Sequence, residues 1–148
     1  VAMRAAEGAK LREDVLARLC TLEKDVGVIE QTSAARVQKY TDKLYARLKE
    51  LLDNVDVDPQ RVAMEVAIFA DKGCIDEELT RLDSHLIQLR EILENGGQVG
   101  RKLDFLVQEM NREANTIGSK SVNSQIAYLV VDIKALIEKI REQVQNVE

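Results

Sequence analysis

The segment Gly100 to Lys120, GRKLDFLVQEMNREANTIGSK, concentrates side chains that could hold a metal ion or take part in acid–base chemistry. Glu109 and Glu113 are four residues apart, so on a helix both carboxylates lie on one face. Mg²⁺ and Mn²⁺ prefer oxygen ligands and often need only one or two protein carboxylates, so this pair is a candidate site for either cation. Asp104, together with a residue of a neighbouring helix, is a further candidate ligand. Because carboxylate pairs are common on helices, the spacing also fits a solvated surface.

The same segment carries an arc of hydrogen-bonding side chains on the side opposite its apolar stripe. At about 100° per residue, the following residues fall within roughly a quarter turn: Arg101, Asp104, Gln108, Asn111, Arg112 and Asn115. Lys102 and the two glutamates flank this polar arc. An exposed helix face usually carries Lys, Glu, Arg and Ala, whereas three amides lower helix propensity and add no charge. The arc therefore indicates a contact surface. Its partner is either a nucleic acid or another helix.

A second group of candidate residues lies in the preceding helix. Glu78, Arg81 and His85 are spaced at i, i+3 and i+7, so they share one face. His85 is the only histidine in the chain, and histidine is the side-chain type that ordinarily titrates near neutral pH. As a general acid or base it could protonate a leaving 5′-oxygen or activate a 2′-hydroxyl. The spacing also fits an ion pair with a nearby surface histidine.

Four carboxylates surround the turn at Gly73. They are Asp71, Asp76, Glu77 and Glu78. Acidic residues at the start of a helix favour helix capping and interact well with the helix dipole, which is the interpretation that the pattern favours. The alternative is a set of metal ligands that faces Glu109.

These residues must be positioned by helices, because the whole chain has helical periodicity. Apolar residues recur every three or four positions from Leu11 to Ile29 and again from Val37 to Leu51. The phase is kept through Ser33, which favours one long helix over an antiparallel pair. Further helices are predicted at residues 59–72, 76–95, 99–117 and from 123 onward, with an acidic turn at 53–58 and loops at 95–97 and 118–121.

The composition is consistent with an all-α chain of long helices in an extended bundle or hairpin. It is 45% hydrophobic and 32% charged, with one proline and few aromatics, and lacks period-two runs that would indicate strands. We expect a single helical domain over residues 1–148, with a long helical arm at 1–52 and a motif-bearing region at 59–148. Because the periodicity is already running by Leu11 and the first residue is Val1, we also expect an upstream part.

Other composition features limit the class of protein. No apolar run approaches the ~18 residues of a membrane span, and no signal peptide is visible. Cys20 and Cys74 have no metal or redox spacing and are expected to be reduced thiols, as in a cytoplasmic protein. The net charge of −5 does not favour nucleic-acid binding, which needs Lys and Arg against phosphate. If RNA is the substrate, the positive surface must be local, formed between subunits or supplied by an upstream part.

Several motifs together resemble the YicC-like endoribonuclease family. Glu78 to His85 resembles its EEL-x-RL-x-SH motif, and Gly100 to Lys120 is similar to its GRKLDFL-x-QEMNREANT-x-x-SK block. Arg61 and the run from Glu65 to Lys72 resemble its R-x-x-x-E-x-A-x-x-A-D-K piece, and the ending KIREQVQNVE resembles its C-terminus. The resemblance covers most of the chain. One departure is Gly73-Cys74, where the family often has a polar pair.

The resemblance implies that the chain is the C-terminal part of a larger cytoplasmic protein that forms a homo-oligomer, in the family a hexamer. It implies an endoribonuclease that uses a divalent cation, Mg²⁺ or Mn²⁺, and acts on RNA rather than DNA. The catalytic candidates are then His85, Glu109 and Glu113, and the metal candidates are Asp104, Glu109 and Glu113. The candidates for substrate binding are Arg101, Lys102, Gln108, Asn111, Arg112, Asn115 and Lys120.

A non-catalytic helical oligomerisation or interaction domain is the alternative function. In that case the polar arc would be a seam between subunits, and the first helix would be a coiled-coil arm. Burial of the arc in a subunit interface would favour this alternative, whereas an open surface would favour the nuclease.

Overall fold

The computed structural model describes residues 2–52, 58–95, 100–121 and 123–147, without the side chains of 2–9, 144, 146 and 147. Within these ranges the chain forms five helices and no strand: α1 (Ala2–Leu52), α2 (Pro59–Asp71), α3 (Asp76–Asn95), α4 (Gly100–Lys120) and α5 (Ser124–Val147). The predicted all-α class is confirmed. The acidic turn and the loop at 95–97 fall largely on residues outside the described ranges.

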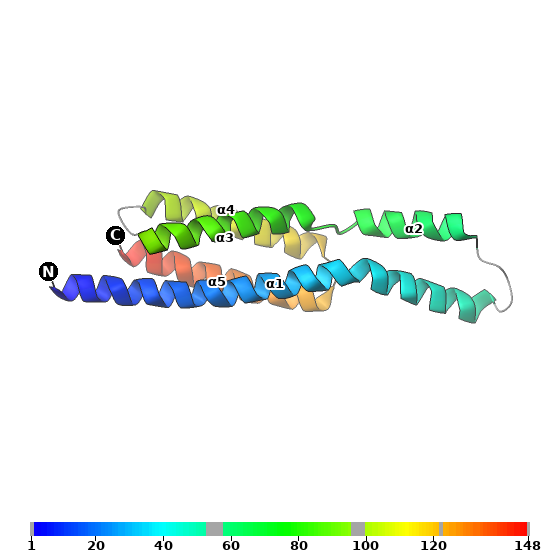
Figure 1. Ribbon diagram of the computed structural model, residues 1–148, viewed down its shortest axis with the longest axis horizontal. Helices are drawn as coiled ribbons and strands as arrows, with labels where there is room; N and C mark the ends of the chain where they lie inside the picture. Colours follow the sequence, from blue (N-terminus) through cyan, green and yellow to red (C-terminus); the bar gives the residue numbers. More distant parts are fainter. Residues whose placement is uncertain (1, 53–57, 96–99, 122, 148) are drawn as a thin grey trace.

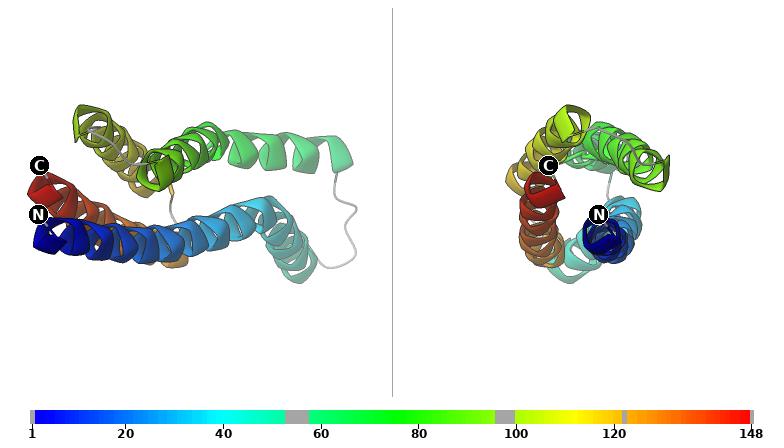
Figure 2. Two further views of the ribbon diagram at one scale, coloured as in Figure 1. Left: turned by 60° about the vertical axis from the view of Figure 1, so that its left-hand side comes forward. Right: turned by 90° about the vertical axis from the view of Figure 1, so that its left-hand side faces the viewer.

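Four of these helices form an antiparallel bundle. The first part of α1 packs against α3 and α5, and α4 closes the bundle by packing against both α3 and α5. Figure 1 shows that the chain direction alternates around this bundle and that both ends of the chain lie at the same end of it. Seen end-on in Figure 2, the helices follow the order α1, α3, α4, α5. Only neighbouring helices in this order therefore pack against each other. The line of contact between α3 and α4 is called the α3–α4 seam below.

The bundle core consists of the apolar stripes that the sequence predicts. Each helix contributes residues spaced by three or four, and the largest fully buried side chains include Leu19, Leu22, Ile29, Leu82, Leu89, Met110, Ile117, Ile133 and Ile140. Burial of one such side chain contributes roughly 1.5–3 kcal/mol to folding. Ser33 is buried in the α1 stripe, as its phase predicts. This core fixes the rotation of every helix, and hence the direction in which each polar face points.

The first helix is a single element, as the apolar phase predicts. It spans 51 residues and continues well past the bundle, where α2 runs back beside it (Figure 1). Asp58 caps α2 by accepting a hydrogen bond from the Gln60 amide, and Pro59 occupies the first helical position, as predicted. Val62 is the only residue of α2 that is buried. The α1–α2 hairpin is therefore held by little apolar packing.

Arg36 fastens the end of α2 to α1. Its guanidinium donates to the backbone carbonyls of Phe69, Ala70 and Lys72 at 2.8–3.2 Å, and it lies 4.6 Å from the centre of the Phe69 ring. The last carbonyls of a helix lack partners within the helix, and a cation there also opposes the negative end of the helix dipole. One side chain of α1 thus serves as the C-terminal cap of α2.

The predicted loop at residues 118–121 is wrong in its first three positions. Helix α4 runs through Gly118 to Lys120, and Ser121 donates its amide to the Ile117 carbonyl. Gly118 faces α5 so closely that an added Cβ would lie 3.1 Å from Val130 Cγ1. Packing against α5 therefore overrides the low helix propensity of glycine. The next helix begins as predicted, because Asn123 caps α5 through its side-chain oxygen.

Other expectations from the composition agree with the described part of the chain. Cys20 and Cys74 are both free thiols. None of the helices in the described ranges has the length and apolar character of a transmembrane span.

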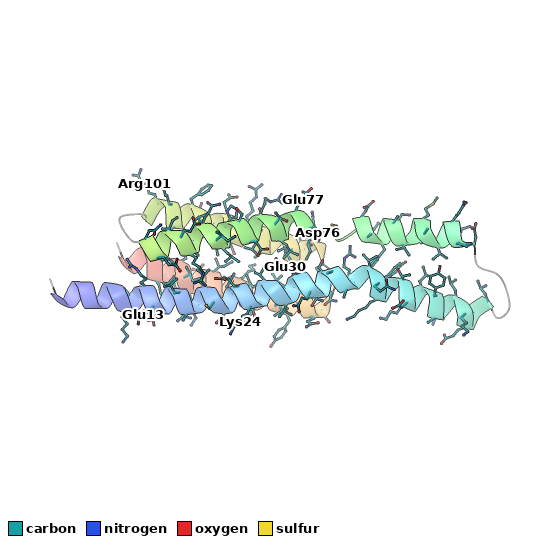
Figure 3. The ribbon with its side chains drawn as sticks, viewed as in Figure 1. Glu13, Lys24, Glu30, Asp76, Glu77 and Arg101 are labelled. Carbon is teal, nitrogen blue, oxygen red and sulfur yellow. The ribbon has the colours of Figure 1, made fainter. Side chains whose placement is uncertain are left out.

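Two pairs of carboxyl groups lie between helices of the bundle. Burial, together with a hydrogen bond to Asp132 of α5 and its charge, raises the pKa of Asp25 from 3.8 to about 6. A hydrogen bond to Asp83 of α3, burial and the Asp83 charge raise the pKa of Glu30 from 4.5 to about 7. Figure 3 shows Glu30 on the side of α1 that faces α3. Each pair attracts while it shares a proton and repels when both groups are ionised.

The Asp25–Asp132 pair makes stability depend on pH. Because the pKa of Asp25 is higher in the folded chain than in the unfolded chain, its contribution is present below about pH 4 and is lost as pH rises through about 6. At pH 8, Asp132→Asn should raise the Tm by about 2–4 °C, which corresponds to about 1 kcal/mol after allowance for solvent screening. At pH 4 it should change little. Thermal melts of this variant and of Asp14→Asn, an exposed control on α1, test the expectation; equal gains at both pH values would contradict it.

Gly73 has the backbone conformation that L residues disfavour, with φ of 76° in the turn before α3. An added Cβ would also lie 3.1 Å from the Lys120 carbonyl oxygen. Gly73→Ala should therefore destabilise the chain by at least about 1–2 kcal/mol and lower the Tm by roughly 3–8 °C. Gly27→Ala is the matched control, because it lies within α1 with nothing within 4 Å and should instead stabilise by about 0.5–1 kcal/mol. Thermal unfolding that shows no difference between the two variants would refute the strain at Gly73.

Candidate metal centre

The seam between α3 and α4 brings together the three predicted catalytic residues. His85 of α3 and Glu109 and Glu113 of α4 each offer a ligand atom, and these atoms all lie within 4.8 Å of one another. Glu113 is buried, whereas His85 and Glu109 are partly exposed, so the group is anchored in the seam and open on one side. His85 Nδ1 is buried without a hydrogen-bond partner among the described residues. A buried ring nitrogen without a partner calls for an explanation such as an ion or a water molecule.

Arg81 holds one carboxylate of this group in place. Its Nε donates to Glu113 Oε1 at 2.9 Å, across the seam and one turn from His85 on the same face of α3. This hydrogen bond and the charge of Glu113 raise the pKa of Arg81 above its ordinary value. The Glu113 side chain is 7% exposed and the Arg81 side chain 49% exposed. The buried carboxylate therefore has a fixed cationic partner that solvent can still reach.

The ion pairs continue along the seam beyond Arg81. Arg81 Nη2 lies 3.8 Å from Glu78 Oε1, and the same oxygen accepts a hydrogen bond from Lys120 at the end of α4. Burial opposes ionisation of Glu78, but the bond from Lys120 and the nearby cations outweigh it, so its pKa lies below the ordinary value. The contacts Glu113–Arg81–Glu78–Lys120 thus form one continuous charged chain.

The four carboxylates around Gly73 do not act as one group. Glu78 is buried and belongs to the charged chain, whereas Asp71, Asp76 and Glu77 are exposed. Figure 3 shows Asp76 and Glu77 at the first turn of α3. Asp76 and Glu77 therefore lie where acidic residues favour the helix dipole. The alternative of metal ligands facing Glu109 gains no support for these two residues.

The polar arc of α4 lies on the outside of the bundle. Arg101, Gln108, Asn111, Arg112 and Asn115 are all exposed, and Asp104 is partly exposed. Phe105 of the same helix is 60% exposed. In the single chain the arc therefore forms an open surface next to the metal candidates.

Asp104 stands apart from the other metal candidates. Its carboxylate accepts a long hydrogen bond of 3.4 Å from Gln108, and among the described residues it is not one of the atoms that converge with His85. Arg101 and Lys102 lie at the start of α4, the opposite end of the bundle from Glu77 (Figure 3). At ~1.5 Å per residue they are about 10–12 Å along the helix from Glu109.

The contacts of Arg81 and Lys120 were beyond the reach of sequence reasoning. The spacing of Glu78, Arg81 and His85 predicts a shared face, but the main partner of Arg81 is on α4, 32 residues away. One signal was present: on α4 the charged residues Lys102, Glu109, Glu113 and Lys120 are separated by 7, 4 and 7 residues. These intervals place them on one helical strip with cations at both ends, but do not say which helix faces the strip.

Comparison with known proteins shows which family this sequence matches. Residues 29–148 match the family described as "Endoribonuclease YicC-like, C-terminal". The chain belongs to this family. The expectation drawn from the motifs is therefore confirmed, and the match contains every residue of the α3–α4 seam.

Two curated relatives extend the similarity to the whole chain. A protein named "Probable endoribonuclease YicC" from Clostridioides difficile is 50% identical over 147 residues, which cover 99% of this chain and 50% of the relative. A protein of the same name from Haemophilus influenzae is 40% identical over 148 residues, which cover 100% of this chain and 51% of the relative. The chain thus spans about half the length of the curated relatives it matches.

Proposed function

We propose that the chain carries the divalent-metal centre of an endoribonuclease, with His85, Glu109 and Glu113 as the protein ligands. The convergence of three ligand atoms within 4.8 Å is the observation that carries this proposal. The names of the family and of the two relatives support RNA as the substrate class.

The residues present fit a divalent cation. Two carboxylates supply the oxygen ligands that Mg²⁺ and Mn²⁺ prefer, and a ring nitrogen of His85 supplies a donor of intermediate softness. A mixed set of this kind favours Mn²⁺ over Mg²⁺, because Mg²⁺ is usually bound by oxygen alone. When bound, the cation would polarise a phosphoryl oxygen and lower the pKa of a coordinated water.

The neighbouring residues orient this centre. Because Arg81 binds Oε1 of Glu113, it fixes the carboxylate and leaves Oε2 available. Partners of this kind typically change metal affinity by about 10–100-fold when removed. We assign His85 to metal binding rather than to proton transfer, because one of its ring nitrogens converges with carboxylate oxygens of Glu109 and Glu113.

The exposed arc of α4 is the proposed contact surface for RNA. Arg101, Lys102 and Arg112 supply cations for phosphate groups, and the amides of Gln108, Asn111 and Asn115 suit sugar and base edges. Arg112 is adjacent in sequence to Glu113, so it is the arc cation nearest to the proposed centre along α4. Since the chain spans half of its relatives, cleavage by the chain alone is itself part of the proposal.

The metal centre is tested by Mn²⁺ binding and RNA cleavage in the same variants. Glu109→Gln and His85→Ala should each weaken Mn²⁺ binding by at least about 100-fold, because each removes a ligand and not merely its support. Both should abolish RNA cleavage, as should EDTA with the unaltered chain. Calorimetric titration with Mn²⁺ measures metal binding, and gel analysis of a labelled RNA measures cleavage. Both measurements are made on the 148-residue chain alone and on a protein as long as the curated relatives that contains it.

Glu91→Gln is the matched control, since it removes one exposed carboxylate of α3 away from the seam. Asp104→Asn tests whether Asp104 is also a metal ligand. Because its carboxylate does not converge with His85, Glu109 and Glu113, this variant should keep its affinity for Mn²⁺. Full Mn²⁺ affinity in both the Glu109→Gln and the His85→Ala variants, with a native circular dichroism spectrum, would refute the centre.

A homo-oligomer is a second proposed property, supported by exposed apolar residues on α5. Tyr128 is 80% and Val131 70% exposed, and their spacing of three places them on one face. A double Tyr128→Glu and Val131→Glu change should convert the oligomer to a smaller species, because it places charge in the proposed contact. Light scattering measures the mass, and Tyr45→Glu, on the distal part of α1, is the control. A monomeric unaltered chain would contradict an assembly through this face.

A further inference from the structure

An open groove of about 640 Å³ lies at the junction of the α1–α2 hairpin with the bundle. Residues 36–43 of α1 form one wall, and the end of α2 and the α4–α5 connection form the rest. Five of the eleven residues that line it are cationic: Arg36, Lys39, Lys43, Lys72 and Lys120. Asp42 is the one acidic residue among those eleven. In a chain of net charge −5, this groove is a local concentration of positive charge.

Two of the five cations already have partners. Arg36 donates to the backbone at the end of α2, and Lys120 binds the buried carboxylate of Glu78. For Lys39, Lys43 and Lys72 the described residues supply no carboxylate within 4 Å. Lys39 and Lys43 are exposed and one turn apart on α1. These three ammonium groups are therefore available to an anionic ligand.

The groove also contains a pair of stacked aromatic rings. Tyr40 of α1 and Phe69 of α2 are parallel to within 6°, and their ring centres are 3.9 Å apart. Both side chains are partly exposed and line the groove between the lysines. Aromatic rings beside a row of cations are the combination that binds single-stranded nucleic acid, because bases stack on the rings while phosphates meet the cations. A peptide of acidic residues would use the lysines but not the flat rings.

The groove is joined to the proposed metal centre by the charged chain described above. Lys120 lines the groove and binds Glu78, and Glu78 connects through Arg81 to Glu113. Lys120 follows Glu113 by seven residues, or about 10 Å along α4. A strand held in the groove therefore lies within a few nucleotides of the centre.

We infer that this groove binds a single-stranded stretch of RNA that adjoins the phosphodiester to be cut, with Lys39, Lys43 and Lys72 on its phosphates and Tyr40 beneath a base. The inference rests on the proposed function for the statement that a bond is cut. Binding itself is independent of that function. Contacts to phosphate and ring faces predict tolerance of sequence and strong dependence on salt.

Binding is measured in EDTA, so that no cleavage takes place, by fluorescence anisotropy of a labelled oligouridylate with the 148-residue chain. The double variant Lys39→Gln/Lys43→Gln should weaken binding by about tenfold and reduce the slope of log K against log salt by about 1.4, or ~0.7 for each phosphate contact. Lys10→Gln/Lys24→Gln is the matched control, since it removes two exposed lysines of the same helix outside the groove. It should retain the affinity of the unaltered chain.

The rings are tested separately from the charges. Tyr40→Leu should weaken binding about tenfold, and Tyr40→Phe should restore it, because stacking on one ring contributes a factor of this order. A DNA or RNA duplex of the same length should bind more weakly than the single strand. Circular dichroism and Mn²⁺ titration of each variant confirm that the bundle and the metal centre are unchanged.

Equal losses in the groove variant and the Lys10/Lys24 control would overturn the inference, as would equal affinity for duplex and single strand. If the groove variant changes the solution mass but not RNA binding, the groove is a protein contact and the inference is wrong. If the chain does not cleave RNA but the groove variants still lose RNA binding, the proposed function is refuted, whereas the inference that the groove binds RNA stands.

Discussion

The need to neutralise two buried carboxylates organises one side of this bundle. Glu78 and Glu113 are 2% and 5% exposed, and a carboxylate removed from water to that extent is costly unless it is paired. Arg81 and Lys120 supply the charge, each from the helix opposite its carboxylate. A pair of this kind contributes little to net stability compared with apolar packing, but loss of one partner is expensive. The register of α3 against α4 is therefore tied to the placement of these four groups, and the position of His85 opposite Glu109 follows from it.

The fold could be derived from the sequence to a large extent, because the apolar stripes are regular. The spacing of residues such as Leu82, Leu86 and Leu89 requires a buried face, and the caps at Asp58 and Asn123 mark helix starts through local hydrogen bonds. The end of α4 could not be derived in this way. Gly118 favours a helix end when considered alone, but α4 continues through it and lies so close to α5 that an added Cβ would be 3.1 Å from Val130 Cγ1.

The residues of the candidate site could be predicted from the sequence, but the contacts between them could not. Helical phase separates Glu109 and Glu113 from the core stripe, and the motifs single out His85, but spacing cannot say that these belong to one cluster. That depends on which seam α3 and α4 share. The groove beside it was missed, because Arg36 and Tyr40 on α1 are more than 25 residues away from Phe69 on α2, and the two segments carry no shared motif. The low aromatic content served only as an argument for helices, although Tyr40 and Phe69 are two of only five aromatic residues.

The weak packing of α2 in the α1–α2 hairpin lets this helix open more easily than the bundle helices. In the described ranges α2 buries one apolar side chain, Val62, and packs only against α1, whereas each bundle helix packs against at least two other helices. Elements with few buried contacts open at a small fraction of the free energy of global unfolding and lose amide-hydrogen protection first. The groove therefore has one wall on a helix anchored in the bundle and another on an element that can open alone. Local opening of α2 would break the hydrogen bonds from Arg36 to the end of this helix and so widen the groove. It would leave in place the seam between α3 and α4 that holds His85, Glu109 and Glu113.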